Sequence, residues 1–390
     1  MTIANLERGA LRDALSAMGA DAWLLFNFRG LNPVAGRMLG LTGLGSRRLF
    51  VSLPCDGEFT ALAHKIELQE VAQFPGRVVA YARWEELHSS LKALVSGRTV
   101  AMEISADDAV PYLDRVPWGV VELVQRLGGK VVSSAPLVTR FAAGWSAAEA
   151  EDHFEAAEIL ADVARQTLAE AVHQGGTGLS ESALQARVVA QLGARGLVFD
   201  HPPIVAFGAN AAKPHYEPVP GEDAVLAPDQ VVLLDLWGGR SPTTVFADQT
   251  WMGFSGRRPP ERVARVWSTV RDAREAAAEL FTARVRSGTP VTGAELDRAA
   301  RAVIERAGFG EWFVHRTGHS IDRDLHGSGP HLDSYETLDE RFLVPGVGFS
   351  IEPGIYLPGE FGVRSEIDGY WSPAGARLTP AERQHELILG

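Results

Sequence analysis

Histidine is concentrated in one short segment of this chain. The sequence FVHRTGHSIDRDLHG spans residues 313–327 and places histidines at 315, 319 and 326, and His331 follows closely. The whole chain has 11 histidines in 390 residues, so four within this stretch is a strong local enrichment. Neutral imidazole is a common metal ligand and also a general acid or base near neutral pH. The segment is therefore a candidate for metal or proton-transfer chemistry.

Four acids lie where apolar strand residues are expected. Asp235 interrupts QVVLLDLWG, and Glu352 interrupts FSIEPGIYL. Asp248 in TVFADQTW and Glu366 in GVRSEIDGYW repeat the pattern. An unpaired carboxylate inside a buried strand is destabilising or becomes protonated. We therefore expect each acid to lie near the middle of its own strand and to face a positive charge.

Convergence of these acids would require cations. Two carboxylates about 4 Å apart repel by roughly 4 kcal/mol at an effective dielectric constant near 20. Arginine can neutralise one or two of them, but four negative charges beside a histidine are balanced better by two divalent cations. Oxygen-rich ligation with one imidazole suits Mn²⁺, Co²⁺, Zn²⁺ or Fe²⁺, and such ions activate water for hydrolysis. Any one acid alone is more often an arginine partner; the set of four favours metal.

The elements of the first third predict an α/β domain, which we place at residues 1–140. Its Gly-rich segment GLTGLG does not spell a dinucleotide-binding motif in register, which favours a loop at 40–45. Strand-like runs at 22–28, 47–53, 59–64, 77–82 and 98–104 alternate with helix-like segments near 5–18, 65–73, 84–96 and 116–128.

The remainder predicts an α+β domain at residues 145–390, with helices outside a mostly antiparallel sheet. Ser146 followed by Glu149 indicates a capping box that begins a long helix ending near Gln174. Further helices are expected at 180–194, 259–286 and 292–307, and strands at 202–208, 230–238, 244–254 and within EWFVHRTG, VGFSIEPGIYL and GVRSEIDGYW.

Composition narrows the class of protein. The formal net charge of -12 disfavours nucleic acid or an anionic membrane surface as the main partner. The single cysteine, Cys55, excludes an intrachain disulfide framework and a cysteine-based metal cluster. The N-terminus does not resemble a signal peptide, and no apolar run approaches the ~20 residues that span a bilayer. We therefore expect a cytoplasmic enzyme or binding protein.

Taken in order, the motifs resemble those of the pita-bread metallopeptidases, which include prolidase, Xaa-Pro aminopeptidase, methionine aminopeptidase and the non-metal enzyme creatinase. The resemblance covers about residues 145–385 and implies a pita-bread catalytic domain. The first third resembles the creatinase-type N-terminal domain by pattern and length only. The matching motifs are the strand around Asp235, Asp248-Gln249-Thr250, Gly318-His319, Ile-Glu-Pro-Gly-Ile-Tyr at 351–356, and Gly-Val-Arg-Ser-Glu at 362–366.

The resemblance implies a role for each matching residue. It implies two divalent ions, with manganese first and cobalt, zinc or iron as other candidates, and a homodimer. Glu352 is the expected proton shuttle, His215 and His326 the groups that polarise the scissile carbonyl, His315 a substrate-side residue, and Arg364 a residue that orients a bridging carboxylate at the substrate site. The implied metal ligands are Asp235, Asp248, His319, Glu352 and Glu366.

Some positions depart from the family pattern. Ser320 and Asp322 stand where the family usually has glycine, Trp251 follows the Asp-x-Thr motif where arginine is usual, and Ile367 follows the last acid where another acid is usual. None of these changes removes a metal ligand. They leave the shape of the pocket, and therefore the choice of substrate, open.

The most specific reading is a metal-dependent dipeptidase that cleaves the Xaa-Pro bond of dipeptides. Three alternatives remain: an Xaa-Pro aminopeptidase acting on longer peptides, a non-catalytic peptidase-like binding protein, and a creatinase-like hydrolase of small amidino compounds. A dipeptidase needs a cation for the free carboxylate of its substrate. The candidates are arginines in expected N-terminal loops, namely Arg29, Arg37, Arg47 and Arg48.

Overall fold

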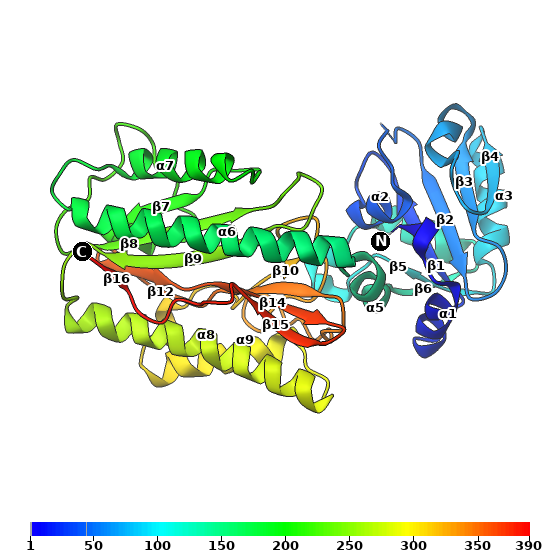
Figure 1. Cartoon of the computed structure of the whole chain (residues 1–390). Helices are drawn as coiled ribbons and strands as arrows, with labels where there is room; N and C mark the ends of the chain where they lie inside the picture. The colour runs from blue at the N-terminus through cyan, green and yellow to red at the C-terminus, as the bar shows by residue number, and fades with distance from the viewer. Residues whose placement is uncertain (1, 44) are drawn as a thin grey trace. The chain divides into compact units, whose positions relative to one another are not determined.

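The computed structural model describes residues 2–43 and 45–390. The chain forms two compact units, Met1–Gly144 and Trp145–Gly390, and each has its own hydrophobic core. Figure 1 shows the two units in blue-to-teal and in green-to-red.

The first unit is built on a six-stranded mixed sheet with strand order β4-β3-β2-β1-β5-β6. Its strands are β1 Ala22–Asn27, β2 Leu49–Pro54, β3 Thr60–His64, β4 Arg77–Tyr81, β5 Thr99–Met102 and β6 Lys130–Ser133. Its α-helices are α1 Arg8–Ala17, α2 Pro33–Leu39, α3 Trp84–Val95, α4 Trp118–Arg126 and α5 Ala135–Leu137. Short 3-10 or π turns are η1 Ile3–Asn5, η2 Lys65–Val71, η3 Ala106–Asp108, η4 Pro111–Leu113 and η5 Val138–Ala142.

The central strand β1 explains the continuous apolar run in this part of the sequence. Trp23 and Leu25 pack into one core and Leu24 and Phe26 into another, so both faces of the strand are covered. A strand that is buried on both faces shows no alternation of apolar and polar residues.

Two local features of this unit differ from the sequence expectations. The segment expected as a helix near 65–73 is the irregular 3-10 turn η2, because Glu67 has non-helical backbone angles and its carboxylate accepts hydrogen bonds from the backbone of Ser46 and Arg47. Arg37, expected in a loop, lies in α2. That helix is capped by Asn32, whose side chain accepts from the Ala35 amide, and it begins with Pro33.

The second unit places its strands between two pairs of helices, as Figure 1 shows for α6 and α7 on one side and α8 and α9 on the other. One sheet has strand order β16-β9-β8-β7, a second has order β10-β11-β14-β15, and β12 and β13 form a hairpin. The pairings are antiparallel except for that of β16 with β9, which is parallel. This agrees with the mostly antiparallel sheet expected from the sequence.

The helices are α6 Ala147–Ala171, α7 Glu181–Ala194, α8 Glu261–Ser287 and α9 Gly293–Arg306, with 3-10 turns η6 Val172–Gln174, η7 Gly208–Ala212 and η8 Gly310–Trp312. The strands are β7 Ile204–Phe207, β8 Val231–Gly238, β9 Ala247–Phe254, β10 Ser320–Ile321, β11 Gly348–Ile351, β12 Gly354–Leu357, β13 Phe361–Arg364, β14 Ile367–Ser372, β15 Gly375–Thr379 and β16 Ile388–Leu389.

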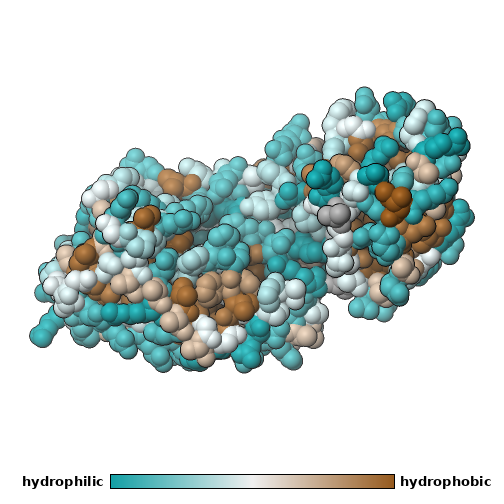
Figure 2. Space-filling model, turned by 90° about the horizontal axis from the view of Figure 1, so that it is seen from above, coloured by the Kyte–Doolittle hydropathy of each residue, from teal (hydrophilic) through white to brown (hydrophobic). Residues whose placement is uncertain are grey.

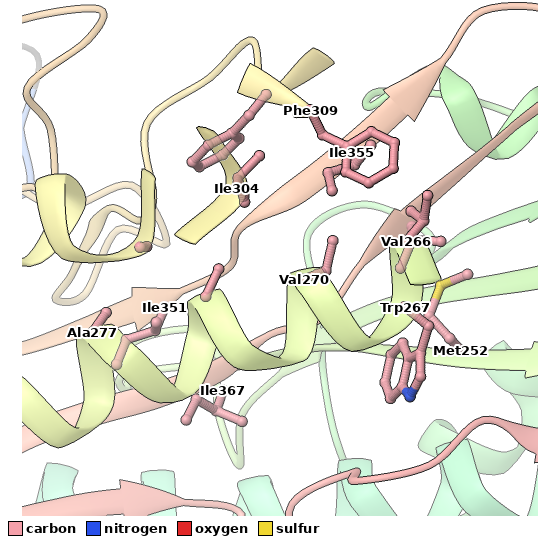
Figure 3. Close-up of a cluster of buried hydrophobic side chains, with 14 of the residues drawn as sticks. Met252, Val266, Trp267, Val270, Ala277, Ile304, Phe309, Ile351, Ile355 and Ile367 are labelled. Atoms are coloured by element: carbon pink, nitrogen blue, oxygen red, sulfur yellow. The ribbon is translucent and has the colours of Figure 1, made fainter. Parts of the chain in front are cut away.

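The helix ends follow from local sequence. The expected capping box at Ser146 and Glu149 is present and begins α6. Thr292 and Glu295 cap α9 in the same way. Helix α8 ends at Ser287 and is followed by the C-cap residue Gly288, which adopts a left-handed conformation. Helix α8 buries one face against the strands, and Figure 3 shows Val266, Val270 and Ala277 along it.

Three expected strands of this unit were wrong in detail. EWFVHRTG contains the turn η8 and no strand. VGFSIEPGIYL is two strands, β11 and β12, and GVRSEIDGYW divides into β13 and β14. Both breaks separate strands of different sheets, and Pro353 in the first break lacks the amide hydrogen that a continuous ladder needs.

Among the described residues, no helix has both the length and the apolar character that crossing a membrane requires. The face drawn in Figure 2 mixes hydrophilic and apolar side chains without a continuous apolar belt.

Candidate metal centre

Strands β8 and β9 place two of the acids on one face of their sheet. Along β8, Val231 and Leu233 pack into the core that contains α8, and Asp235 continues that face because alternate residues of a strand point the same way. Met252 and Phe254 belong to the same core, so Asp248 lies on the corresponding face of β9. The two acids thus replace apolar residues on a buried face.

A threonine joins this face to the last acid. Thr250 lies directly opposite Asp235 in the ladder. Its hydroxyl oxygen is 2.8 Å from Glu366 Oε2 and 3.2 Å from Asp235 Oδ1, and it accepts a hydrogen bond from Arg364 Nε at 2.9 Å. Thr250 therefore fixes the spacing of two carboxylates and a guanidinium.

His319 lies in the same site, at a point where the backbone of Gly318 packs closely against the backbone of Ser350. A Cβ on Gly318 would lie 2.0 Å from the Ser350 carbonyl oxygen, so only glycine fits before this histidine. His319 Nδ1 lies 3.2 Å from the Ser320 carbonyl oxygen. That bond leaves Nε2 as the basic nitrogen, which lies 3.4 Å from both Asp248 Oδ2 and Glu352 Oε1.

Glu352 and Glu366 were expected in the middle of strands. They lie instead in the two breaks between strands, Glu352 between β11 and β12 and Glu366 between β13 and β14. Glu352 follows β11, and its amide donates to the Thr317 carbonyl oxygen at 2.7 Å. Glu366 precedes β14, and its amide donates to the Thr250 carbonyl oxygen at 3.2 Å. The breaks release both acids from their ladders and bring them beside the residues of β9 and β10.

All five acid and histidine residues therefore meet. Ligand atoms of Asp248, His319 and Glu366 lie within 4.8 Å of one another, and Asp235 and Glu352 are joined to them by the contacts above. The five line one cavity of about 560 Å³ in the second unit. Asp235 and Glu366 thus line one cavity although 131 residues separate them along the chain.

Crowding and burial perturb the ionisation of these groups. Burial raises the pKa of Asp248 and of Glu366 well above the usual range, and the neighbouring carboxylates raise both further. Burial also raises the pKa of Asp235, against the opposing effect of Arg364. Burial acts the same way on Glu352, but the combined charges of His319, His315, Arg364 and His326 outweigh it, and the pKa of Glu352 is lowered.

The site fits divalent cations by two observations. Among the described residues, Asp248 Oδ1 and Glu366 Oε1 are buried and have no hydrogen-bond partner, which is costly unless a cation completes them. The donor set of four carboxylates and one imidazole nitrogen is typical of Mn²⁺, Co²⁺, Zn²⁺ or Fe²⁺.

The three other histidines of interest differ in position. His215 and His326 line the cavity, and the rings of His326 and His319 have centroids 4.2 Å apart. The His319 charge, followed by burial, lowers the pKa of His326 to about 3. His315 has both ring nitrogens engaged, Nδ1 with the Arg316 carbonyl at 2.7 Å and Nε2 with the Tyr356 hydroxyl at 2.8 Å.

Arg364 is held among acid and hydroxyl groups of the site. Its guanidinium forms a short ion pair with Asp235 and bonds to Thr250 and to the Tyr356 hydroxyl. It is 4% exposed, so its contacts are mainly with the protein. Arg364 thus holds Asp235 directly and is linked to Glu366 through the Thr250 hydroxyl; that it orients a carboxylate shared by two ions stays a prediction.

Several residues around the site were not identified from the sequence. Thr250 and Tyr356 belong to the quoted motifs, but nothing in those motifs shows their hydrogen bonds. Asp322, a departure from the family pattern, is buried and accepts from the Ser328 amide and hydroxyl, so it shapes the loop that carries His326. His331 is buried, and its Nδ1 accepts from the Ser320 amide, which is a structural role.

A buried acid lies behind Asp248. Asp368 Oδ2 accepts from the Asp248 amide at 3.0 Å and lies 3.5 Å from His153 Nε2. His153 also contacts the Thr379 hydroxyl and the Phe246 carbonyl oxygen. These groups hold the backbone of β9 at Asp248, and no local sequence signal indicates their association.

Comparison with known proteins agrees with this architecture. Residues 151–370 match metallopeptidase family M24. The chain is 29% identical over 342 residues to the probable dipeptidase PepE of Mycobacterium tuberculosis, covering 86% of this chain and 84% of that protein. It is 34% identical over 215 residues to an Xaa-Pro dipeptidase of Lactobacillus helveticus, covering 54% of each.

Two solved structures extend the match to the whole fold. The dipeptidase PepE of Mycobacterium ulcerans superposes with a TM-score of 0.74 and 25% identity, covering 98% of this chain and 96% of that one. The prolidase of Thermococcus sibiricus gives a TM-score of 0.67 and 25% identity, covering 98% of both chains. The expected combination of an α/β N-terminal unit and a pita-bread C-terminal unit is thereby confirmed, and the chain belongs to metallopeptidase family M24.

Proposed function

We propose that this enzyme hydrolyses the Xaa-Pro bond of dipeptides with two divalent metal ions held by Asp235, Asp248, His319, Glu352 and Glu366. The observation that carries the proposal is the convergence of these five side chains in one cavity. The names of the Lactobacillus helveticus and Thermococcus sibiricus relatives support the substrate class.

We carry the ligand roles over from the family resemblance. Asp235 would hold one ion, His319 and Glu352 the other, and Asp248 and Glu366 would contribute to both. Four carboxylates and Arg364 leave three net negative charges, and two dications would convert these into one positive charge. We place manganese first among the metals because hard carboxylate oxygens dominate the donor set. When bound, such ions act as Lewis acids that polarise a carbonyl and activate water.

Glu352 is the group best placed to move protons. Its pKa is lowered, so it is ionised at neutral pH and can accept a proton, and its side chain is 16% exposed in the cavity. The nitrogen of an Xaa-Pro bond is a tertiary amide nitrogen without a hydrogen, and it must be protonated to leave. Glu352 would deliver the proton that it takes from water to that nitrogen.

The histidines of the cavity would stabilise negative charge on the scissile carbonyl oxygen. His326 is neutral at pH 7 because its pKa is about 3, so it can donate an N–H without adding a full charge. His215 lines the same cavity. His315 is held by Tyr356, which in turn bonds to Arg364. His315 and Arg364 would therefore shape the substrate side of the site.

Glu352→Gln tests the proton-transfer role. The variant keeps the size of the side chain and one oxygen, so we expect a folded protein whose kcat falls by about a thousand-fold or more. Circular dichroism and thermal unfolding check the fold. Near-normal turnover would remove Glu352 from the mechanism.

A second candidate is an Xaa-Pro aminopeptidase acting on longer peptides, and one observation favours it. Both arginines that line the cavity are already paired, Arg323 with Glu149 at 2.6 Å and Arg364 with Asp235. Within the described residues of this cavity, neither is left for the carboxylate of a dipeptide. Comparing hydrolysis of Met-Pro with Met-Pro-Ala decides the matter: cleavage of the tripeptide alone rejects the dipeptidase.

Chelation separates the remaining alternatives. Hydrolysis that is lost with chelator and restored by Mn²⁺ supports the peptidase. A binding protein would show no turnover with any metal, and a creatinase-like hydrolase would keep its activity in chelator. The homodimer and the cytoplasmic location stay predictions.

A further inference from the structure

One wall of the cavity extends beyond the metal centre along strands β7 and β8. Ile204 lies opposite Asp235 in the ladder, and Val198 forms an isolated bridge with Gly239. Asp200 lies between these two pairings, and Trp237 is two residues beyond Asp235 on the same face of β8. Asp200, Ile204 and Trp237 all line the cavity.

Asp200 is held in place at this wall. Trp237 Nε1 donates to Asp200 Oδ1 at 2.8 Å, and the His201 amide donates to the same oxygen at 2.9 Å. Burial tends to raise the pKa of Asp200, but these hydrogen bonds outweigh it and the pKa is lowered. The side chain is 55% exposed, so an ionised carboxylate faces solvent in the cavity.

The charges around Asp200 leave it available to a ligand. Within residues 2–43 and 45–390, its ion-pair contact is with the His201 ring at 3.3 Å and not with an arginine or lysine. The cavity arginines Arg323 and Arg364 are engaged by other carboxylates. Beside Asp200, Trp237 supplies an aromatic surface, and a carboxylate next to an indole is a favourable environment for an ammonium or guanidinium.

We propose that Asp200 and Trp237 form a subsite for a basic side chain, lysine or arginine, on the residue that precedes the scissile bond. The inference rests on the proposed function. In an Xaa-Pro dipeptide the side chain of Xaa is the one that varies, because the other residue is always proline. Two residues along a strand span roughly 6–7 Å, so Trp237 lies about one extended lysine side chain beyond Asp235.

A purely structural role for Asp200 makes a different prediction. If its bonds to Trp237 and His201 only shape the turn, loss of the carboxylate would change the hydrolysis of all substrates by the same factor. Recognition of a basic side chain instead changes the ratio between a basic substrate and a neutral substrate of the same length.

The test compares kcat/KM of the wild type and of Asp200→Asn for Lys-Pro and norleucyl-Pro. The lysine and norleucine side chains have similar length and differ in the ammonium group. The corresponding Xaa-Pro-Ala tripeptides are measured in the same way. We expect wild-type enzyme with Mn²⁺ to favour lysine over norleucine in kcat/KM. In the variant, the ratio of kcat/KM for the lysyl substrate to kcat/KM for the norleucyl substrate should fall by about 5- to 10-fold. Most of this change should be a higher KM for the lysyl substrate, while the kinetics of the norleucyl substrate change little. In 0.5 M NaCl the wild-type preference should shrink, because salt screens partly exposed charges.

Two further variants sharpen the test. Trp237→Phe keeps the ring but removes the hydrogen bond to Asp200, and we expect it to lose about 2- to 3-fold of the preference. Glu170→Gln removes one exposed charge from α6, outside the cavity lining, and should leave the ratio unchanged.

The outcomes are distinguishable. No preference for lysine in the wild type, or an equal effect of Asp200→Asn on both substrates, overturns the subsite while hydrolysis of norleucyl substrates upholds the proposed function. Absence of hydrolysis of every substrate by the metal-loaded wild type overturns the proposed function and the subsite with it.

Discussion

The two units bury acids in opposite ways. Glu103 in the first unit is 0% exposed, and its two carboxylate oxygens accept from Trp23 Nε1 at 2.6 Å, Asn32 Nδ2 at 2.6 Å and the Ser134 hydroxyl at 2.9 Å. In the second unit, Asp248 Oδ1 and Glu366 Oε1 have no such donor among the described residues. Burial raises the pKa of all three acids.

The difference separates a structural acid from a functional one. Both carboxylate oxygens of Glu103 accept hydrogen bonds from neutral protein groups, so this acid requires no bound ligand or ion. Asp248 and Glu366 are placed beside other carboxylates and are left incomplete, which destabilises the protein until a cation binds. We therefore expect removal of the first kind of acid to harm stability and removal of the second kind to harm function only.

The largest effect should come from Asp248→Asn. We expect metal affinity to fall by about 100-fold or more and kcat/KM by about a thousand-fold or more, because the variant loses a carboxylate that we propose as a ligand of both ions. The metal-free variant should be as stable as the wild type or more stable, since a repelling charge is gone. Calorimetric titration with Mn²⁺ and thermal unfolding in chelator measure both. A metal-free variant destabilised by more than about 2 kcal/mol would break the comparison.

Glu103→Ala should have the opposite profile. It leaves three buried donors unpaired and opens a cavity, so we expect a loss of about 3–5 kcal/mol in the free energy of unfolding. The matched control Glu85→Ala, at an exposed position of α3, should change stability by less than about 0.5 kcal/mol. Urea unfolding measures both; equal midpoints for the two variants would contradict the structural role of Glu103.

The buried His153 gives a pH test of the second unit. Burial lowers the pKa of His153 to about 4. Between pH 6.5 and pH 4, His153 is therefore protonated in the unfolded chain but neutral in the folded chain. Stability is therefore complete above pH 6.5 and falls by about 3 kcal/mol as the pH is lowered to 4. The pKa of Asp368 is raised by burial, so its own contribution to the free energy of unfolding grows as the pH falls. Asp368 is present in both the wild type and His153→Phe.

Unfolding of wild type and His153→Phe, both without metal, isolates this contribution. The difference in their free energies of unfolding should change by about 3 kcal/mol between pH 7 and pH 4. A difference that is constant over that range would show that His153 does not titrate as its burial implies.

Thr250→Val should have the smallest of these effects. The valine keeps the shape but removes the hydroxyl that joins Arg364, Asp235 and Glu366. We expect a 10- to 100-fold loss of metal affinity with little change in fold. Thr250→Ser, which keeps the hydroxyl, is the control; equal losses in both variants would mean that the methyl group and not the hydroxyl matters.

The sequence identified what is encoded locally or in an ordered series of motifs. The five candidate ligands could be named because each lies in a short pattern, and the capping box at Ser146 and Glu149 could be read from spacing alone. The N-cap Asn32 and Pro33 of α2 were equally local signals, although the helix was too short to show periodicity.

What could not be predicted depends on contacts between distant segments. The pairing of Arg364 with Asp235 spans 129 residues, and the support of Asp248 by Asp368 spans 120. The strand breaks at Glu352 and Glu366 arise because the chain changes sheets there, although the apolar pattern runs on without interruption. Asp200 was missed because a single acid followed by a histidine and two prolines looks like a loop residue until Trp237 is placed against it.

The most direct test of this account is the metal content of the purified chain after equilibration with Mn²⁺ and removal of free ions, measured by elemental analysis for the wild type and for Asp248→Asn. We predict about two ions per wild-type chain, and a large loss in the variant. A wild-type chain that holds no divalent metal, yet hydrolyses Xaa-Pro peptides at full rate in chelator, would contradict it.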